Sequence, residues 1–544
     1  MIALGLIPIG RATAQFGEMA NPDGAFPTAG LALSGKVLYG TAQAGGSSGH
    51  GEVFALNADG TGFMGLHSFT GGDGMNPYAS LVSWSNTLYG TANCGASTGA
   101  GTVFEINIDG AGFLNLHTFA VTAGSALTNS EGADAYAGLI LSGETLYGTT
   151  EDGGTAGGGS VFAINTDGSQ FMNLHSFSAT VSDGNRLTNS DGSQPQAGLL
   201  LSGSSLYGAA MVGGTSGGGT IFTLDTIGTG FATLHNFAGG STNSLGVYTN
   251  SEGANPTAKL VLSGNTLYGT AQNAGDAGNG AVFAVNTDGT GFRVLHTFTE
   301  LINHTNRDGA TPHAGLVLSG NILYGAAEYG GSCGNGVIFA INTDGTGFTN
   351  LYNFAFLYPP GTNSDGTYPY GTLVLSGNKL YGTGLFGGDS GNGTVFALNT
   401  DGTGFTALHS FTKLSMTVPQ LTITASGPNL LLSWPINTGS ILYSVESTMD
   451  LSAPSWNPVS FIADASSGLN KVTLPTGAPQ FFRLKPLTGG CLLDSDCPEG
   501  STCVRGVCMV ITGGGGGGIG FGFGFGFGFG GFGFGGFGFG SFEF

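Results

Sequence analysis

Histidine recurs at a fixed spacing and is the first residue type whose pattern suggests chemistry. A Leu-His-x-Phe segment places each histidine 28 positions after a tyrosine, as His67 follows Tyr39. A ring of imidazoles binds a metal only if several ring nitrogens converge to about 2.1 Å from one ion. Recurrence in nearly every copy instead favours a structural histidine, half-buried and bonded to a neighbouring turn. The histidines are His67, His117, His175, His235, His296 and His409, with Tyr352 at the equivalent place of a further copy.

Five loops share the pattern Thr-Asn-(Ser/Arg)-(Asp/Glu)-Gly. Such oxygen-rich loops could hold calcium, which takes about 6 to 8 oxygen ligands. One carboxylate per loop is too few for that, and Asx turns prefer the same residues. We therefore expect turns and no bound cofactor, with calcium held between loops as the alternative. The loops are 129–132, 189–192, 250–253, 306–309 and 363–366.

Aromatic and polar side chains in the same connections are candidates for ligand binding. Tyrosine rings stack on sugars, and they serve equally well as amphipathic cover for a sheet edge. A surface glycan or a protein is the expected partner if these residues bind one. The candidate binding residues are Tyr248, His304, Asp308, His313, Tyr358, Asp365 and Tyr368, and Tyr370 is a further aromatic of these loops.

Linear signatures assign no catalytic residue and no metal ligand. HExxH and the P-loop are absent, and Gly-x-Ser-x-Gly occurs only in Gly-rich loops, for example at 95–99, without the following helix of a nucleophile elbow. No dinucleotide fingerprint stands between a strand and a helix. The paired carboxylates of a polysaccharide hydrolase can come from distant positions and leave no such signature. A non-enzymatic role is therefore favoured, with a polysaccharide-active enzyme as the alternative.

The elements that position these residues come from a repeat. Leu-Tyr-Gly recurs seven times, and the fifth copy predicts strands at 259–262, 266–271, 281–286 and 292–298, with Gly-containing turns between them. Four-stranded units repeated seven times predict a seven-bladed β-propeller, with a β-solenoid as the alternative. The tyrosines are Tyr39, Tyr89, Tyr147, Tyr207, Tyr268, Tyr324 and Tyr381.

Length variation falls only between the fourth strand of one unit and the first strand of the next. In a four-stranded meander these connections share a rim with the loops between the second and third strands. One rim is thus short and constant, and the other is elaborated. Because binding residues concentrate on variable loops held by a rigid scaffold, the elaborated rim is the predicted working face.

The repeat resembles a known family. Leu-Ser-Gly-x-x-Leu-Tyr-Gly-Thr-Ala, Gly-x-Gly-Thr-Val-Phe and Asn-Thr-Asp-Gly-Thr-Gly-Phe-x-x-Leu-His-x-Phe look like the tandem repeat of bacterial choice-of-anchor GloVer-type proteins, over residues 22–412. The resemblance implies an exported repeat protein with an interchangeable C-terminal anchor or sorting segment. It implies no established activity. We expect the propeller to span residues 15–415.

Composition excludes several classes. Among 544 residues, 105 are Gly and only 8% are charged, and the net charge is −21. Widespread Gly excludes a helical bundle, and the acidic balance argues against a nucleic-acid partner. No apolar run is long enough for a transmembrane helix. Residues 1–14, apolar and ending in Ala-Thr-Ala, resemble a signal peptide.

Three further segments are expected after the repeats. Residues 420–487 look like a small fibronectin-type-III-like β-sandwich. Residues 488–510 resemble a short disulfide module, whose four cysteines allow three pairings: Cys491, Cys497, Cys503 and Cys508. Residues 511–544 form a Gly/Phe-rich low-complexity tail, either disordered or suited to attachment or self-association. Cys94 and Cys333 occupy non-equivalent places of their repeats and are expected to be unpaired.

Taken together, these features predict an extracellular or cell-surface protein that acts as a binding or structural module. The alternatives are a secreted polysaccharide-binding or polysaccharide-degrading propeller and a subunit of an extracellular fibre joined through Phe-Gly tails or strand exchange.

Overall fold

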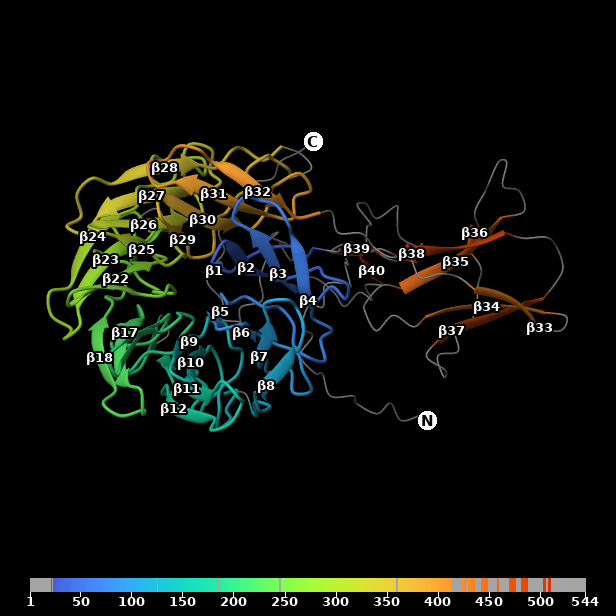
Figure 1. Cartoon of the computed structure of the whole chain (residues 1–544), viewed down its shortest axis with the longest axis horizontal. Helices are drawn as coiled ribbons and strands as arrows, with labels where there is room; N and C mark the ends of the chain where they lie inside the picture. The colour runs from blue at the N-terminus through green and yellow to red at the C-terminus, as the bar shows by residue number, and fades with distance from the viewer. Residues whose placement is uncertain are drawn as a thin grey trace, which may run out of the picture. The chain divides into compact units, whose positions relative to one another are not determined.

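The computed structural model describes residues 21–412, except 22, 125, 183–185, 244–245 and 359–360, and the backbone of short strands beyond residue 412. The chain divides into two compact units, and residues 19–415 form the larger one. In this unit seven four-stranded antiparallel sheets stand in a ring (Figure 1). The protein is a seven-bladed β-propeller, as predicted, and the solenoid alternative is wrong. None of the described residues forms a helix that could cross a bilayer.

Each blade is one continuous stretch of chain with its strands in sequence order. The first, innermost strands are β1 (Ala32–Ser34), β5 (Val82–Trp84), β9 (Ile140–Ser142), β15 (Leu200–Ser202), β21 (Val261–Ser263), β25 (Val317–Ser319) and β29 (Val374–Ser376). The second strands are β2 (Val37–Ala42), β6 (Thr87–Ala92), β10 (Thr145–Thr150), β16 (Ser205–Ala210), β22 (Thr266–Ala271), β26 (Ile322–Ala327) and β30 (Lys379–Gly384).

The third and fourth strands complete the blades. The third strands are β3 (Glu52–Asn57), β7 (Thr102–Asn107), β11 (Ser160–Asn165), β17 (Thr220–Asp225), β23 (Ala281–Asn286), β27 (Val337–Asn342) and β31 (Thr394–Asn399). The outermost strands are β4 (Met64–Ser68), β8 (Leu114–Thr118), β12 (Met172–Ser176), β18 (Ala232–Asn236), β24 (Arg293–Thr297), β28 (Thr349–Asn353) and β32 (Thr406–Ser410). In the fifth blade the predicted second and third strands agree with the observed bounds to the residue.

The glycine of Leu-Tyr-Gly is required by packing. Phe54 of β3 is fully buried and lies over Gly40 of β2, where an added Cβ would come within 2.5 Å of the Phe54 Cζ. The pair Gly40 and Phe54 also face each other in the strand register. Every blade repeats this contact. The phenylalanine ring of the third strand fits against the sheet only because the facing residue of the second strand is a glycine without a side chain.

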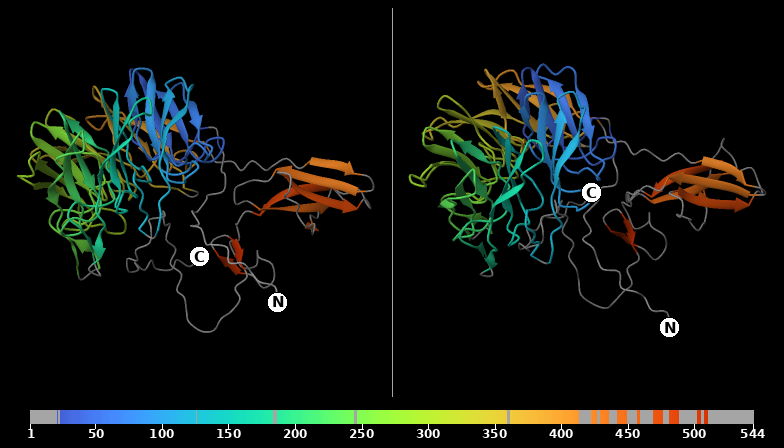
Figure 2. Two further views of the ribbon diagram at one scale, coloured as in Figure 1. Left: turned by 90° about the horizontal axis from the view of Figure 1, so that it is seen from below. Right: turned by 60° about the horizontal axis from the view of Figure 1, so that its bottom comes forward.

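The two rims of the ring differ as predicted. Short turns join the first strand to the second and the third to the fourth, while the remaining loops share the other rim. On the elaborated rim two connections form small hairpins of their own, β13 (Val181–Ser182) with β14 (Leu187–Thr188) and β19 (Ser241–Thr242) with β20 (Tyr248–Thr249). The edge-on views of Figure 2 show loops of the teal and green blades extending beyond the strands on one side.

The hydrophobic core consists of seven similar layers, each between two neighbouring sheets. The last layer closes the ring: Leu38 and Phe54 of the first blade pack with Tyr381, Val395 and Phe411 of the seventh. No strand is exchanged across this seam, because the strands of both blades are contiguous in sequence.

Beyond residue 412 the backbone forms two three-stranded sheets and one hairpin. The first sheet has the order β33–β34–β37, the second β36–β35–β38, and β39 pairs with β40. Their bounds are β33 (Thr422–Ser426), β34 (Asn429–Pro435), β35 (Leu442–Thr448), β36 (Asn457–Pro458), β37 (Leu469–Pro475), β38 (Phe481–Leu487), β39 (Thr502–Val504) and β40 (Val507–Met509).

These sheets fall within the predicted sandwich and disulfide segments, but the fibronectin-like assignment stays a prediction. The side chains of Cys491, Cys497, Cys503 and Cys508 lie outside the described residues, as do the expected signal peptide and the Gly/Phe tail. Cys94 and Cys333 are unpaired, which confirms the prediction for them.

Candidate functional site

A bond between an outer-strand histidine and a carboxylate recurs at six of the seven junctions between blades, and a tyrosine replaces the histidine at the remaining one. The Nε2 of His296, at the end of β24, lies 3.0 Å from Asp308 Oδ2 in the loop that leads to the next blade. Because an ionised carboxylate only accepts, Nε2 carries the proton. We call each such pair a clamp. The clamps are His67–Asp73, His117–Glu131, His175–Asp191, His235–Glu252, His296–Asp308, Tyr352–Asp365 and His409–Asp23.

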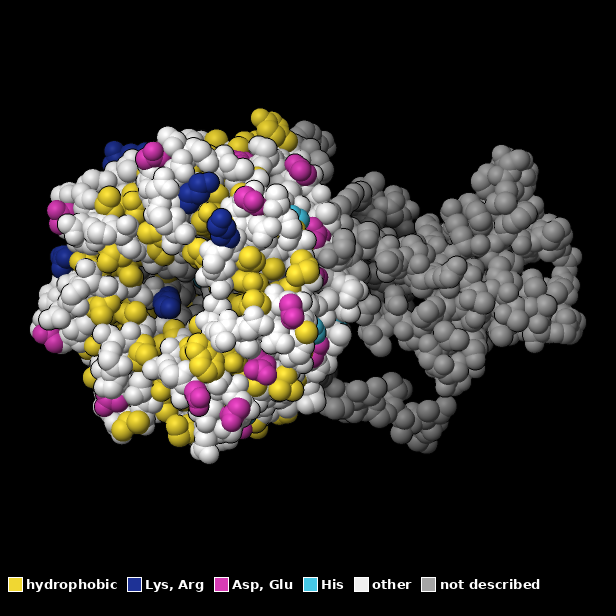
Figure 3. All heavy atoms as spheres, viewed as in Figure 1, with side chains coloured by type: hydrophobic (Ala, Val, Ile, Leu, Met, Phe, Trp, Pro, Cys, Tyr) yellow, Lys and Arg dark blue, Asp and Glu magenta, His cyan; other side chains and the backbone are white. Residues whose placement is uncertain are grey.

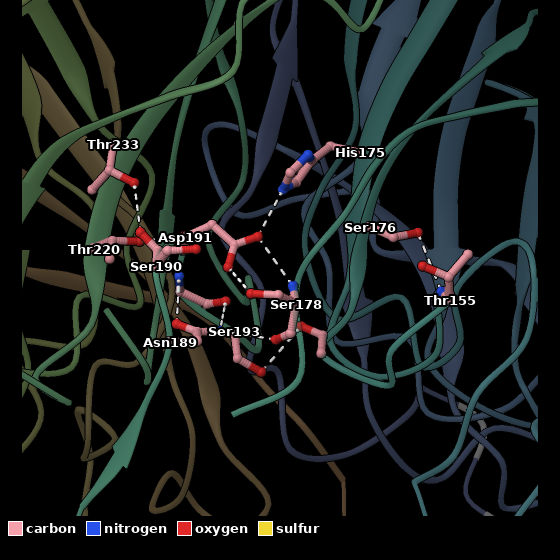
Figure 4. A network of polar contacts seen from close by, with 12 residues as sticks. Thr155, His175, Ser176, Ser178, Asn189, Ser190, Asp191, Ser193, Thr220 and Thr233 are labelled. Atoms are coloured by element: carbon pink, nitrogen blue, oxygen red, sulfur yellow. Dashed lines mark hydrogen bonds and ion pairs between the residues drawn. The ribbon is translucent and has the colours of Figure 1, made fainter. Parts of the chain in front are cut away.

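Figure 4 shows the clamp between the third and fourth blades. His175 Nε2 lies 3.2 Å from Asp191 Oδ2, which also accepts the main-chain N–H of Ser178 at 3.0 Å. The Ser178 hydroxyl donates to the other carboxylate oxygen. Burial alone would raise the pKa of Asp191, but the hydrogen bonds from His175 and Ser178 outweigh it and lower the pKa. The carboxylate is thus held ionised as part of the framework.

The clamp histidine also joins two blades through its ring. The His175 ring stacks on Phe231 of the following blade, with centroids 3.8 Å apart. Burial lowers the pKa of His67 and of His235 in spite of the nearby carboxylates, which favours the neutral imidazole. In the described part of the chain no three His, Cys, Asp or Glu side chains come together as a metal group. The histidines are half-buried and bonded to a neighbouring loop, which is the arrangement that the structural interpretation expects.

The asparagine of the Thr-Asn-x-(Asp/Glu)-Gly loops makes the predicted Asx turn. Asn189 Oδ1 accepts the N–H of Gly192 at 2.9 Å and that of Gly214 at 2.8 Å, while its Nδ2 donates to the main-chain oxygen of Ser178. Both ends of the Asn189 amide are thus engaged in hydrogen bonds that hold the loop.

The segment before β1 supplies the missing copy of this loop and closes the ring. Asn21 Oδ1 accepts the N–H of Gly46, and Asp23 accepts from His409 at 3.1 Å and from the Thr412 N–H at 3.0 Å. Thr383 Oγ1 donates to Ala29 O at 2.9 Å. The seam is therefore held by the same contacts as the six continuous junctions.

The third residue after each clamp carboxylate bridges two blades through its backbone. Thr311 donates its N–H to Asn279 O of the preceding blade at 2.9 Å and accepts from the Glu328 N–H of its own blade at 3.1 Å. Its φ is 57°, a left-handed conformation that is strained for a branched residue. All seven copies share the positive φ although their side chains differ: Phe26, Asn76, Asp134, Gln194, Asn255, Thr311 and Tyr368.

The side chains that differ most between repeats gather where these loops meet the inner strands. We call this region the mouth. It comprises the third and fifth residues after each clamp carboxylate and the fourth and fifth residues after each Leu-Tyr-Gly tyrosine. The fifth residues after the carboxylate are Thr28, Tyr78, Tyr136, Gln196, Thr257, His313 and Tyr370. The repeats keep one framework and diverge here, as expected where recognition is located.

Four aromatic side chains form a bonded chain across the mouth. Tyr136 and Tyr370, from nearly opposite junctions of the ring, share a hydrogen bond of 2.8 Å between their hydroxyls. Tyr370 is bonded in turn to His313 Nε2 at 2.7 Å, and Tyr78 stacks on Tyr136 at 4.9 Å. Burial lowers the pKa of His313 to about 3, so its ring is neutral. The chain thus links side chains from opposite sides of the mouth.

Just inside this chain the backbones of the blades converge. A Cβ added to Gly30 would lie 2.6 Å from Thr372 O, and one added to Gly138 would lie 2.9 Å from Ser80 O. These residues are the seventh after their clamp carboxylates, where most repeats have Gly. The face of the ring in Figure 3 is hollowed near its centre, and a Lys or Arg side chain lies beside the hollow.

Two carboxyl groups stand at equivalent mouth positions of the third and sixth blades. Burial raises the pKa of Glu151 to about 7, helped by the charge of Asp152, while Gln196 donates to it at 3.0 Å. Burial likewise raises the pKa of Glu328 to about 7, although a hydrogen bond from Tyr329 acts to lower it. Near neutral pH each group therefore exists in both protonation states.

The structure distributes the predicted binding residues over three places. His313 and Tyr368 lie in the mouth, with Tyr370. Asp308 and Asp365 are clamp carboxylates. Asp308 therefore does not form one site with His304 and His313, the other candidate binding residues of its loop. The remaining three occupy outer parts of the connections: Tyr248 in β20, His304 at an exposed position with φ of 65°, and Tyr358, which is 66% exposed.

Several mouth residues were not singled out from the sequence. Tyr78, Tyr136, Glu151, Glu328 and Tyr329 occupy positions at which the seven repeats disagree. Aligning the copies on the clamp carboxylate and on the Leu-Tyr-Gly tyrosine would have marked these positions, since the residues around them hardly vary.

The ring of equivalent blades and clamps defines a propeller built from tandem copies of one repeat. A family model described as the Gloeobacter/Verrucomicrobia repeat matches the chain four times, over residues 6–129, 120–245, 181–354 and 238–434. The chain belongs to this repeat family, as the sequence resemblance indicated. No curated protein matches it.

Solved propellers resemble the chain at low identity. A candidate 6-phosphogluconolactonase from Bacteroides uniformis is 17% identical, with a TM-score of 0.44, over 70% of this chain and 96% of that one. A puromycin-hydrolyzing peptidase from Mycobacterium tuberculosis is 11% identical, with a TM-score of 0.44, over 77% and 61%. An oligogalacturonate lyase in complex with manganese is 11% identical, with a TM-score of 0.38, over 82% and 99%. At these values the likenesses assign no activity to this chain.

Proposed function

We propose that the protein is an exported, non-enzymatic binding module whose ligand site is the mouth of the propeller. One observation carries the proposal: seven repeats with the same clamps and the same strained backbone differ at the mouth positions. A purely structural ring has no need for this divergence, whereas a recognition surface requires it.

The mouth assignment is tested by comparing the full-length chain with Tyr136→Thr on arrays of surface glycans and extracellular proteins. Threonine occupies this position in two other copies, Thr28 and Thr257. We expect the variant to lose a binding signal that His304→Ala, on an outer loop, retains. Thermal unfolding of both variants checks that they fold. Ligands that bind both variants equally would overturn the mouth as the site.

Export and display are separate parts of the proposal. N-terminal sequencing of the chain recovered outside the producing cell should begin at Gln15, after the small-residue pattern. A chain that keeps Met1 and stays inside the cell would contradict export. Deleting residues 513–544 should abolish surface retention or self-association, and unchanged retention and unchanged assembly would remove the role of the tail and with it the fibre alternative.

A second candidate function is polysaccharide hydrolysis at the mouth. Glu151 and Glu328 favour it, because a carboxyl with a pKa near 7 is suited to serve as a general acid. Release of reducing ends from neutral polysaccharides, lost in both Glu151→Gln and Glu328→Gln, would establish the enzyme. Binding without release, at enzyme concentrations that saturate the polysaccharide, would exclude it for the substrates tested.

A further inference from the structure

One side of the mouth carries four aromatic rings in contact. The centroids of Tyr329 and Tyr368 are 5.2 Å apart, those of Tyr368 and Phe386 5.9 Å, and those of Phe386 and Phe26 5.3 Å. Tyr329 is 41% exposed, and the other three rings are half-buried. These residues, which we call the aromatic arc, come from the sixth, seventh and first blades and so lie side by side around the ring.

The arc is not a product of the repeat. At the position of Phe26 and Tyr368 the other copies have polar residues in the same left-handed conformation, and at the position of Tyr329 and Phe386 they have small, aliphatic or polar residues. Neither position is aromatic elsewhere in the ring. The residues are Asn76, Asp134, Gln194, Asn255 and Thr311 at the first position, and Ala44, Cys94, Asp152, Val212 and Asn273 at the second.

Charge restricts the ligand. The mouth positions contain no Lys or Arg, and their ionisable groups include Asp134, Glu151, Asp152 and Glu328. A phosphorylated or acidic ligand would be repelled by the ionised groups among them. Lys259, the seventh residue after its clamp carboxylate, is the one cation at the neighbouring positions, and burial lowers its pKa. The remaining choice lies between a cation held over the rings and a neutral, hydroxyl-rich molecule.

A hydroxyl beside the arc favours the neutral molecule. Thr28, two residues after Phe26, is 5% exposed, and among the described residues its hydroxyl finds no hydrogen-bond partner. A hydroxyl both donates and accepts, so it pairs with a ligand hydroxyl but offers no charge to a cation. Glu328 is buried beside Tyr329, and the protonated form that burial promotes also donates to a hydroxyl.

We propose that the aromatic arc, with Glu328 and the hydroxyl of Thr28, binds a neutral oligosaccharide. The inference rests on the proposed function and gives its ligand class. The apolar faces of the sugar rings stack on Tyr368 and Phe386, and the sugar hydroxyls bond to the polar groups of the mouth.

The test is calorimetric titration of the full-length chain with cellohexaose, xylohexaose, mannohexaose and laminarihexaose. At least one should bind, and Tyr368→Asn should weaken that binding at least tenfold, as should Phe386→Asn. Asparagine suits the left-handed backbone and occupies the first position in Asn76 and Asn255, so Tyr368→Asn should fold. Tyr358→Asn makes the same substitution at a 66% exposed tyrosine on an outer connection, outside the mouth, so it is the matched control and should keep the affinity of the wild type.

The outcomes separate the ligand class from the proposed function. Saccharide binding that survives Tyr368→Asn and Phe386→Asn overturns the arc as its site. Binding of spermidine or tetramethylammonium that depends on Tyr368, with no saccharide bound, overturns the ligand class and leaves the mouth as a binding site. If no saccharide, amine or arrayed protein binds in a way that depends on the mouth, both the inference and the proposed function fail.

Discussion

The clamps and the mouth lie on the same loops, yet they follow opposite rules. Asp308 and His313 are five positions apart: the first repeats a contact made at every junction, and the second has no equivalent histidine in any other copy. Inter-blade contacts are thus carried by a few constant residues of each loop. The side chains beside them are left free to differ, so recognition can change without altering the scaffold.

The largest expected effect comes from removing a clamp carboxylate. Asp308 accepts from His296 and from both the N–H and the hydroxyl of Thr299, so Asp308→Ala leaves three donors without their acceptor. We expect it to lower the free energy of unfolding by about 3 kcal/mol, against less than about 1 kcal/mol for the mouth variant Tyr368→Asn.

Chemical denaturation of the two variants, followed by intrinsic fluorescence, measures this difference. If both variants lost the same free energy of unfolding, the clamp residues would not be more important for stability than the mouth residues. Asp308→Asn serves as a control of shape, because it preserves the volume of the side chain while removing its charge.

The next effect belongs to the seam and depends on pH. Glu52 of β3 is 4% exposed. Four of the other six blades have a hydroxyl at this position, which donates to the main-chain oxygen of the clamp carboxylate, as Thr220 does to Asp191 O at 3.1 Å. Burial, helped by the charge of Asp23, raises the pKa of Glu52 from 4.5 to about 8. Only the first blade places a carboxyl at this position.

Glu52→Thr should therefore stabilise the chain progressively as the pH rises. Between pH 4.5 and about 8 the folded chain keeps a proton that the unfolded chain releases, so wild-type stability falls through this range and the loss is complete above it. We expect the free energy of unfolding of the wild type, relative to that of Glu52→Thr, to fall by on the order of 2 kcal/mol between acid and alkaline conditions. Thermal melts across this pH range measure the gap, and parallel curves for the two chains would contradict the ionisation of Glu52.

The sequence predicted the scaffold because each scaffold contact is local or repeated. Leu-Tyr-Gly, the Asp-Gly turns and the histidine spacing depend on residues within one blade or at one junction. All seven copies of the repeat predict the same strands and turns. The segment with Asn21 and Asp23 was not recognised as a further copy of the loop, because it lacks the threonine and precedes the first tyrosine repeat.

The mouth could not be derived in the same way. Tyr136 and Tyr370 are bonded although 234 positions separate them, because closure with seven blades makes their junctions face each other. Six or eight blades would have brought other residues together. The predicted working rim contains the mouth, but which of its side chains converge depends on a closed geometry that no local pattern encodes.

The smallest expected effect tests whether the clamp needs histidine at all. The sixth blade has Tyr352 in its place, bonded to Asp365 at 2.7 Å and stacked on Phe405 at 3.9 Å, so a phenol satisfies both the carboxylate and the neighbouring ring. His296→Tyr should therefore change the free energy of unfolding by less than about 0.5 kcal/mol, whereas His296→Phe should cost about 1 to 2 kcal/mol. Phenylalanine preserves the stacking on Phe348 and removes one of the three donors to Asp308. Denaturation of the two variants isolates that hydrogen bond from the stacking, and equal stability of both would mean that stacking alone joins the blades.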